Sequence, residues 1–385
     1  MSDAILAPGT AFGNYEVIAE IGQGGMGRVY KARDTLLDRP VALKVLSEAL
    51  SRDEGFVQRF TREARVAARL NHPNIVQIYS FGREGSTWYL AMELIDGNSI
   101  GGFMRSGAQF DEHDSITIVR HAARALRVAH QAGIVHRDVK PENLMMSMRG
   151  EVKLVDLGLA KSLEDDASLT GTGLTMGTPH YISPEQVRAQ KDIDGRADVY
   201  SLGATLYHMA SGKTPYTADS PSLVILKHLT DAPVDPRTHR PELTEGLSRV
   251  ILRMMARERE NRYRDMHAVD RDLERLQKGL EPLLGAGTDP STISSSETLA
   301  TPARLDATSR SATAGGVTSM TGGADPQLRA YEKELARYIG PMAKVLVRRT
   351  ARTASSMDEL ALKLAQELPS EADRATFLAA VKKNA

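Results

Sequence analysis

A short polar stretch of the chain, residues 134–143, gathers side chains that are suited to moving a phosphoryl group. Asp138 can orient an attacking hydroxyl and accept its proton, and Lys140 can reach a transferring γ-phosphate. Asn143, five residues after Asp138, offers an amide oxygen to Mg²⁺. A solvated polar loop is the competing interpretation, but the strand patterns that flank this stretch make it a poor one.

A second candidate metal ligand, Asp156, follows the apolar strand pattern of residues 152–155. A carboxylate at the end of a strand suits a hard, oxygen-seeking cation. Because Leu157 and Gly158 come next, a plain turn with Asp before Gly is the competing interpretation when this residue is taken alone.

A glycine-rich stretch near the N-terminus can bring the backbone close to phosphates, because Gly22, Gly24 and Gly27 carry no Cβ. An ordinary glycine-rich hairpin is the competing interpretation. A dinucleotide-binding fold needs a helix after the glycines, whereas residues 29–32 have a strand pattern. We therefore expect a loop that covers ATP between two strands, with these residues lining the nucleotide: Ile21, Gly22, Gln23, Gly24, Gly25, Met26, Gly27, Arg28 and Val29.

One lysine, Lys44, lies inside the apolar strand pattern of residues 41–46. A lysine in such a place is costly unless its charge is paired, although its stem can also pack while its head reaches water. Glu63, on the helix that follows, is the expected partner. We expect Lys44 to hold the α- and β-phosphates while Glu63 holds Lys44.

The elements that must position these residues divide the chain into a strand-rich and a helix-rich part. Alternating and β-branched runs predict strands at residues 15–21, 28–32, 41–46, 75–81 and 88–94, interrupted by one helix over residues 53–70. From residue 111 onward apolar residues repeat every three to four positions, which predicts helices. This order of elements indicates an α+β fold with a small sheet lobe followed by a large helical lobe.

Length and composition are those of a globular protein with two or three domains, since the chain has 385 residues, 41% of them apolar and 25% charged. Lys and Arg number 49 and Asp and Glu also 49, so no nucleic-acid or membrane-surface binding is expected. There is no cysteine, which excludes disulfides and thiolate metal sites. We expect no signal peptide and no transmembrane segment, and hence a cytoplasmic protein.

The last third of the chain changes character twice. Residues 280–325 are rich in Ser, Thr, Gly and Ala and predict a flexible linker. Residues 326–385 return to helical periodicity and predict a small helical module that binds an unknown partner or oligomerises. The basic residues of its second helix leave open a membrane-surface or nucleic-acid role, but a solvated face is the better interpretation.

Taken in order, these residues resemble the eukaryotic protein-kinase superfamily. Along the chain come the glycine loop, Lys44, Glu63, the H-R-D…N stretch, Asp156 in the place of the D-F-G motif and Ser183-Pro184-Glu185 in the place of A-P-E. The sequence is similar in particular to the eukaryotic-like serine/threonine kinases of bacteria. The resemblance implies a bilobal catalytic domain over residues 14–279, use of ATP with Mg²⁺ or Mn²⁺, and transfer to Ser and Thr hydroxyls of protein substrates in signal transduction. Pairing of two copies through the small lobes is also implied.

By the same resemblance, Met92 is the gatekeeper, Glu93 to Ile95 form the hinge for adenine, and Ala42 and Met145 join Val29 in sandwiching it. Further residues take roles by position: Thr178 as the contact of Asp138 and Lys140, Asp198 as the anchor of the catalytic loop, and Glu185 with Arg262 as a buried structural ion pair. The chain departs from the family at Leu157, which replaces Phe, at Ser183, which replaces Ala, and at Ala67, which is small for its place.

Arg137, directly before Asp138, marks in this family regulation by phosphorylation of the activation loop. Thr170, Thr172 and Thr175 are the candidate sites, because a phosphate there could pair with Arg137. Ordinary loop composition also explains these hydroxyls. The alternative function is that of a pseudokinase, a scaffold that binds nucleotide without transferring a phosphoryl group. Such a protein should lack at least one of four residues, and all four are present: Lys44, Asp138, Asn143 and Asp156.

Overall fold

The computed structural model describes residues 5–157, 179–284, 326–339, 342–351, 354, 356–366, 368 and 371–383. The chain divides into two compact units, residues 1–284 and 285–385. The predicted activation-loop threonines and the predicted linker from residue 285 onward lie outside the described residues.

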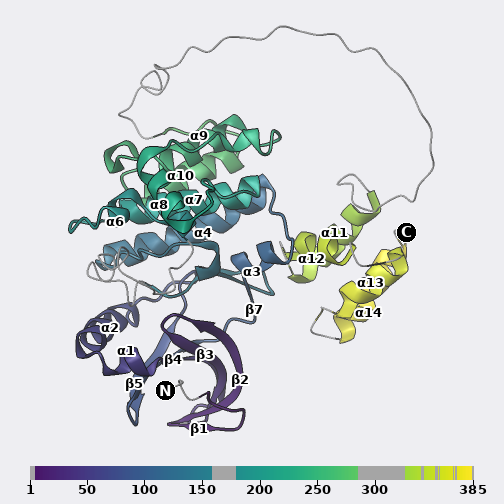
Figure 1. The fold of residues 1–385 in the computed structure, drawn as a ribbon. Helices are drawn as coiled ribbons and strands as arrows, with labels where there is room; N and C mark the ends of the chain where they lie inside the picture. Colours follow the sequence, from purple (N-terminus) through teal and green to yellow (C-terminus); the bar gives the residue numbers. More distant parts are fainter. Residues whose placement is uncertain are drawn as a thin grey trace. The chain divides into compact units, whose positions relative to one another are not determined.

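The first unit begins with a six-stranded antiparallel sheet whose strands lie in the order β1-β2-β3-β4-β6-β5 (Figure 1). Two short helices follow β4, and Asp53 caps the second of them by accepting a hydrogen bond from the Phe56 amide at 2.9 Å. The elements of this lobe are β1 (Ala11–Phe12), β2 (Tyr15–Gly24), β3 (Gly27–Asp34), β4 (Arg39–Leu46), α1 (Glu48–Arg52), α2 (Glu54–Ala67), β5 (Ile78–Glu84) and β6 (Thr87–Glu93).

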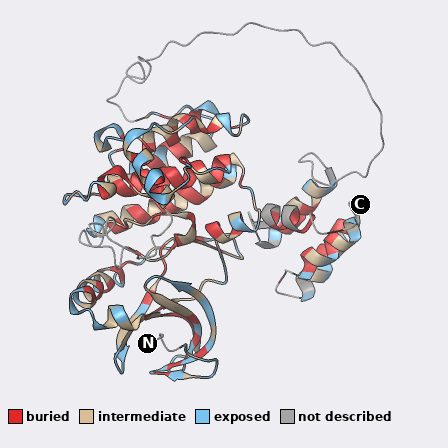
Figure 2. Ribbon diagram, in the orientation of Figure 1, coloured by how far each residue is buried: buried red, intermediate tan, exposed pale blue. Residues whose placement is uncertain are grey.

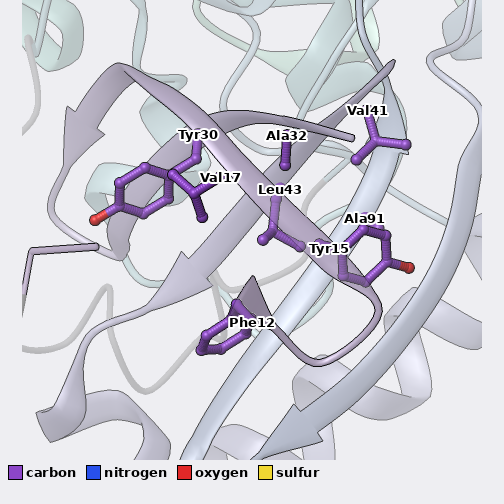
Figure 3. Close-up of a cluster of buried hydrophobic side chains, with 8 residues drawn as sticks. All are labelled: Phe12, Tyr15, Val17, Tyr30, Ala32, Val41, Leu43 and Ala91. Carbon is purple, nitrogen blue, oxygen red and sulfur yellow. The ribbon is translucent and has the colours of Figure 1, made fainter. Parts of the chain in front are cut away.

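One face of this sheet is closed by a cluster of side chains from β1, β2, β3, β4 and β6 (Figure 3). Apolar residues that alternate along these strands point to the same side, so they meet above the sheet and leave the water together. The members are Phe12, Tyr15, Val17, Tyr30, Ala32, Val41, Leu43 and Ala91. The cluster holds β3 and β4, which carry the glycine loop and Lys44, in one rigid layer.

The second lobe of this unit is helical and contains a small three-stranded sheet, ordered β7-β8-β9. Buried residues run along α7 on nearly every side, whereas α9 and α10 bury one face each (Figure 2). Its elements are β7 (Gly97–Ser99), α3 (Ile100–Arg105), α4 (Glu112–Gln131), β8 (Leu144–Ser147), β9 (Val152–Leu154), α6 (Pro184–Val187), α7 (Arg196–Ser211), α8 (Pro221–Thr230), α9 (Glu245–Met254) and α10 (Met266–Gln277). The α+β prediction with two lobes is confirmed.

The described part of the second unit consists of α11 (Pro326–Ile339), α12 (Met342–Ala351), α13 (Met357–Gln366) and α14 (Glu371–Lys383). Apolar side chains from each helix are buried together, among them Leu335, Val347, Leu364 and Phe377. Helical periodicity in the sequence predicted these elements, and the helix-capping pattern at Ser356 is present as a hydrogen bond from the Glu359 amide. Among the described helices of both units, none combines the length and the apolar character that crossing a membrane requires.

A buried ion pair joins α6 to the loop before α10. The guanidinium of Arg262 binds both carboxylate oxygens of Glu185, at 2.7 and 2.8 Å, and also donates to the carbonyls of Ala256, Arg196 and Arg257. The two side chains are 0% and 4% exposed. Because every donor direction is used, this pair, which the sequence predicted, ties α6 to α7 and to the end of the helical lobe.

Removing one partner of this pair should destabilise the first unit strongly. Arg262→Ala leaves Glu185 charged and buried, and we expect a loss of about 3–5 kcal/mol in the free energy of unfolding, measured by urea titration. Lys278→Ala is the control, because Lys278 forms a pair with Glu274 in which both side chains are largely exposed. Its cost should stay below about 1 kcal/mol. Equal losses in the two variants would contradict the prediction.

Candidate active site

A buried carboxylate on α7 holds the loop that carries the candidate proton acceptor. Asp198 accepts hydrogen bonds from the backbone amides of His136 and Arg137, each at 2.8 Å, and lies 2.7 Å from Nε2 of His130. Burial opposes ionisation of Asp198, but the hydrogen bond and charge of His130 outweigh it, so the pKa of the carboxyl lies below its ordinary value. The predicted anchoring role of Asp198 agrees with this geometry.

The anchored loop turns sharply at Arg137, whose φ of 62° lies in the left-handed region. The turn is supported on its other side, because Nε2 of Gln186 in α6 donates to the Arg137 carbonyl at 2.8 Å. The loop is thus fixed between α6 and α7, and this places Asp138 at a defined position directly after the turn.

Three of the predicted site residues come together at this position. Nζ of Lys140 lies 2.8 Å from Oδ2 of Asp138, and Nδ2 of Asn143 donates to the Asp138 carbonyl at 2.8 Å and to its Oδ2 at 3.1 Å. The amide nitrogen of Asn143 therefore faces Asp138, which leaves the amide oxygen as the donor for a cation. Lys140 supplies a positive charge next to the candidate base.

Lys44 reaches this region from β4 and pairs with Asp156 rather than with Glu63. Its Nζ lies 2.7 Å from Oδ1 of Asp156, and the lysine side chain is only 8% exposed. Although Lys44 and Glu63 are both described, the structure contains no ion pair between them. The expected Lys44–Glu63 contact is therefore corrected: the sequence places Glu63 on the right face of its helix, but the position of that helix relative to β4 decides the contact.

The carboxylate of Glu63 is left in a costly environment. Its Oε2 atom is buried and has no hydrogen-bond partner. Burial raises the pKa of Glu63, against the lowering effect of the positive charges on Arg62, Arg137 and Arg59. Glu63 is therefore a group that gains from finding a cationic partner.

The glycine loop is the hairpin between β2 and β3. Gly24 pairs with Gly27, and Gly27 has a φ of 139°, at a place where an added Cβ would meet the Val45 carbonyl at 2.1 Å. At Gly24 and Gly25, by contrast, an added Cβ would meet nothing within 4 Å. The fold itself therefore requires glycine only at the end of the loop.

Further residues predicted to surround the nucleotide lie on neighbouring strands, and the side chain of one of them, Arg28, is engaged elsewhere. Val29 pairs with Lys44, and Ala42 pairs with Met92, so these side chains belong to the centre of the sheet. The Nη1 atom of Arg28 lies 2.8 Å from both carboxylate oxygens of Glu20. This contact bridges the two strands of the hairpin, so Arg28 has a structural explanation that needs no ligand.

The hinge follows β6 and leads to β7. The carboxylate of Glu93 binds Lys153 at 2.9 Å and accepts from the Gln77 amide at 3.2 Å. The backbone amide of Glu93 donates to the Gln77 carbonyl at 2.9 Å, so the side chain and the N–H of Glu93 are both engaged within the protein. Met145 lies on β8, half-buried, and Ile95 is half-buried in the connection. Thr178, together with Thr170, Thr172 and Thr175, lies outside the described residues.

Two groups that the sequence did not single out as functional belong to this region. His130 follows the buried residues of α4, directly after Ala129, and contacts Asp198. Nδ1 of His208 on α7 lies 2.7 Å from the hydroxyl of Tyr181, directly after the undescribed segment. A polar residue in a buried stripe signals that a partner exists, but the partner of His130 lies 68 residues away along the chain.

The donor set suits a hard divalent cation. Asp156 contributes carboxylate oxygens and Asn143 an amide oxygen, which are the ligands that Mg²⁺ and Mn²⁺ take. Among the described residues, no group of three or more His, Cys, Asp or Glu side chains forms an all-protein metal site. Two protein ligands are typical of a cation that is also held by the phosphates of a substrate.

Comparison with known proteins gives consistent matches. Residues 15–273 match the protein kinase domain family, and residues 326–385 match a family described as a domain of unknown function (DUF8082). Serine/threonine-protein kinase PknB of Mycobacterium leprae is 40% identical over 272 residues, which are 70% of this chain and 44% of the relative. A probable serine/threonine-protein kinase of Clostridium acetobutylicum is 40% identical over 70% of this chain and 41% of its own length. This chain thus spans less than half of these relatives.

Among solved structures, the PknI kinase domain of Mycobacterium tuberculosis superposes with a TM-score of 0.59 at 31% sequence identity. The superposition covers 72% of this chain and 100% of that domain.

Two histidines of the helical lobe, His208 on α7 and His228 on α8, give stability a pH dependence. Burial, and next the charge of His180, lowers the pKa of His208 to about 4 and that of His228 to about 3. Unfolded histidine titrates near pH 6.5, so below this pH the unfolded chain binds more protons than the folded chain. Stability should therefore fall as the pH drops from about 6.5 towards 4, by up to about 1.4 kcal/mol per pH unit for each histidine.

Urea unfolding between pH 4 and pH 7 checks this expectation. His208→Gln should reduce the slope of the free energy of unfolding against pH by the contribution of one histidine. His113→Gln, at an exposed position, should leave that slope unchanged. Parallel profiles for the wild type and His208→Gln would show that this residue does not contribute.

Proposed function

Because this chain belongs to the protein kinase family, we propose that it is a serine/threonine protein kinase that transfers the γ-phosphoryl group of ATP, with Mg²⁺ or Mn²⁺, to hydroxyls of protein substrates. The observation that carries the proposal is the convergence of Asp138, Lys140 and Asn143 within hydrogen-bond reach of one another on a loop fixed by Asp198. Proton acceptor, cation and metal ligand are the parts that phosphoryl transfer needs.

In this proposal each side chain acts on a different part of the reaction. Asp138 orients the substrate hydroxyl and accepts its proton, and Lys140 neutralises charge that develops on the transferring group. Lys44 binds the α- and β-phosphates, and Asp156 and Asn143 hold the divalent cation, which when bound neutralises phosphate charge. The protein supplies mainly position and charge, because the reaction passes through a loose, in-line transition state.

Lys44 must change partners for this arrangement to form. A lysine that binds phosphates and an Asp156 that binds a cation cannot rely on each other as their main counter-charge, as they do at 2.7 Å. Glu63, whose Oε2 atom is buried and lacks a hydrogen-bond partner, is the carboxylate that can pair with Lys44 instead. In this proposal Lys44 pairs with Glu63 when the nucleotide and the cation are bound, and with Asp156 otherwise.

The adenine position follows from the strand pairing. Ala42 and Met92 lie side by side at the buried centre of the sheet, and Met145 comes from β8 in the other lobe. Apolar groups from two sheets suit a flat aromatic base, and the backbone of residues 93–95 supplies its hydrogen bonds. The glycines of the β2–β3 hairpin approach the phosphates.

Regulation by phosphorylation is part of the proposal. The backbone of Arg137, directly before the candidate base, is held in a left-handed turn by Asp198 and Gln186. A phosphothreonine at residue 170, 172 or 175 would add a charge of about −1.5 to −2 that Arg137 can bind. We further propose that the chain acts in signal transduction in the cytoplasm, that two copies pair through their sheet lobes, and that residues 326–385 bind a protein partner.

Replacing the proton acceptor separates a kinase from a nucleotide-binding scaffold. Asp138→Asn should lower phosphoryl transfer from radiolabelled ATP to a generic basic protein by about 10²–10⁴-fold. ATP binding, measured by calorimetry, should persist. Asp219→Asn, at an exposed position before α8, is the control and should leave the rate unchanged. A wild type as inactive as Asp138→Asn, with ATP still bound, would favour the scaffold.

The activation-loop threonines can be tested as a set. The triple variant Thr170→Ala, Thr172→Ala and Thr175→Ala should lower activity about tenfold or more, because Arg137 loses its phosphate partner. Phosphopeptide mapping of active wild-type protein should find phosphate on at least one of the three. Active protein with all three unmodified would end this part of the proposal.

A further inference from the structure

The first half of α2 is joined to the sheet by four aromatic rings, which we call the aromatic stack: Phe56, Phe60, Phe81 and Trp88. Phe56 and Phe60 lie one turn apart on α2 with ring centroids 5.8 Å apart and planes inclined by 17°. Phe60 meets Phe81 of β5 at 5.5 Å, and Phe81 stacks on Trp88 of β6 at 4.9 Å with planes inclined by 12°. The rings form an unbroken path from the helix to two strands.

The second half of α2 contributes no aromatic ring to the contact with the sheet. Its buried positions after Phe60 are Ala64 and Ala67, each 1% exposed, and alanine is the smallest apolar side chain that a helix can bury. Glu63 lies on the same stretch, one turn after Phe60. The part of α2 before Glu63 is therefore packed through large aromatic rings, and the part after it through small alanine side chains.

The same helix carries Glu63, which has a carboxylate oxygen without a hydrogen-bond partner. Oε2 of Glu63 is buried without a hydrogen bond, and Lys44 pairs with Asp156 instead. A movement of α2 towards β4 would bring Glu63 to Lys44. Packed aromatic rings resist separation in such a movement more than small alanine contacts do. The movement that keeps the stack together is a tilt about the first half of the helix.

We infer that the aromatic stack is the pivot on which α2 turns, and that Phe81 and Trp88 are positioning residues which act through α2 on Glu63. This inference rests on the proposed function for its effect on the reaction, but the mechanical link between Phe81 and α2 stands without it. Trp88 also connects α1 to the stack, because its backbone amide donates to Oγ of Ser51 at 3.3 Å.

Three variants of β5 test the link. Phe81→Leu removes the central ring, Phe81→Tyr keeps it, and Tyr79→Leu removes a ring of the same strand that lies under Arg39, 3.6 Å from its guanidinium carbon, rather than in the stack. In the full chain without nucleotide, Phe81→Leu should speed hydrogen exchange of the α2 amides at least tenfold, whereas Phe81→Tyr and Tyr79→Leu should not. Unchanged exchange of α2 in Phe81→Leu would overturn the inference, whether or not the chain transfers phosphate.

Steady-state kinetics test the effect on the reaction. Phe81→Leu should lower kcat at least fivefold while KM for ATP changes less than twofold, because the groups proposed to contact the nucleotide are untouched. Phe81→Tyr should restore kcat. If Tyr79→Leu lowers kcat as much as Phe81→Leu at an equal loss in unfolding temperature, general destabilisation explains the effect and the positioning role is wrong.

Trp88 supplies a direct signal, since the chain contains one tryptophan. Adding Mg²⁺ with a non-hydrolysable ATP analogue should change the emission of Trp88 in the wild type. Glu63→Ala should abolish this change while calorimetry still detects nucleotide binding, because the carboxylate that draws α2 is gone. The same emission change in Glu63→Ala would show that the signal does not pass through α2. Wild-type protein that binds no nucleotide would contradict the proposed function instead, and the exchange experiment would still decide on the pivot.

Discussion

The carboxylate of Asp198 is the interaction on which the arrangement of the site depends. It lies fully buried on the most enclosed helix of the unit, where an uncompensated charge would cost several kcal/mol. His130 and the amides of His136 and Arg137 compensate it, and in doing so they fix the backbone of the loop that carries Asp138. The same hydrogen bonds therefore stabilise the buried carboxylate in the helical core and fix the position of the candidate base. Losing them would affect both.

A second constraint acts across the two lobes through the charge of Lys44. A nearly buried ammonium group needs a counter-charge, and two carboxylates from different parts of the chain compete for this role. Asp156 provides the counter-charge in this structure, whereas Glu63, which has no ion pair with Lys44, has a pKa that burial raises. Either choice leaves one carboxylate unsatisfied in the absence of further cations. A bound divalent cation would resolve the competition, since it satisfies Asp156 and releases Lys44 to Glu63.

The sequence was sufficient for the elements and for most of the site, since periodic apolar residues and the order of polar motifs are local properties. It predicted the strands around Lys44, the helix with Glu63, and the loop with Asp138 and Asn143. The sequence did not predict contacts between side chains that lie far apart along the chain. The contact of His130 with Asp198 was not predicted, because nothing near His130 in sequence points to Asp198. Glu63 was predicted as the partner of Lys44, whereas Asp156 pairs with Lys44 in this structure, because the position of α2 follows from packing and not from its own periodicity.

Within the glycine loop, the backbone conformation requires glycine at some positions and not at others. At Gly27 the positive φ and the Val45 carbonyl exclude any side chain, so the hairpin itself demands glycine. At Gly24 and Gly25 there is open space for a Cβ, and glycine inside a strand costs about 0.5–1 kcal/mol relative to alanine. The fold therefore gains nothing from glycine at these two positions. Under the proposed function, the contribution of these two glycines is a close approach of phosphate oxygens to the backbone, which a Cβ at either position would hinder.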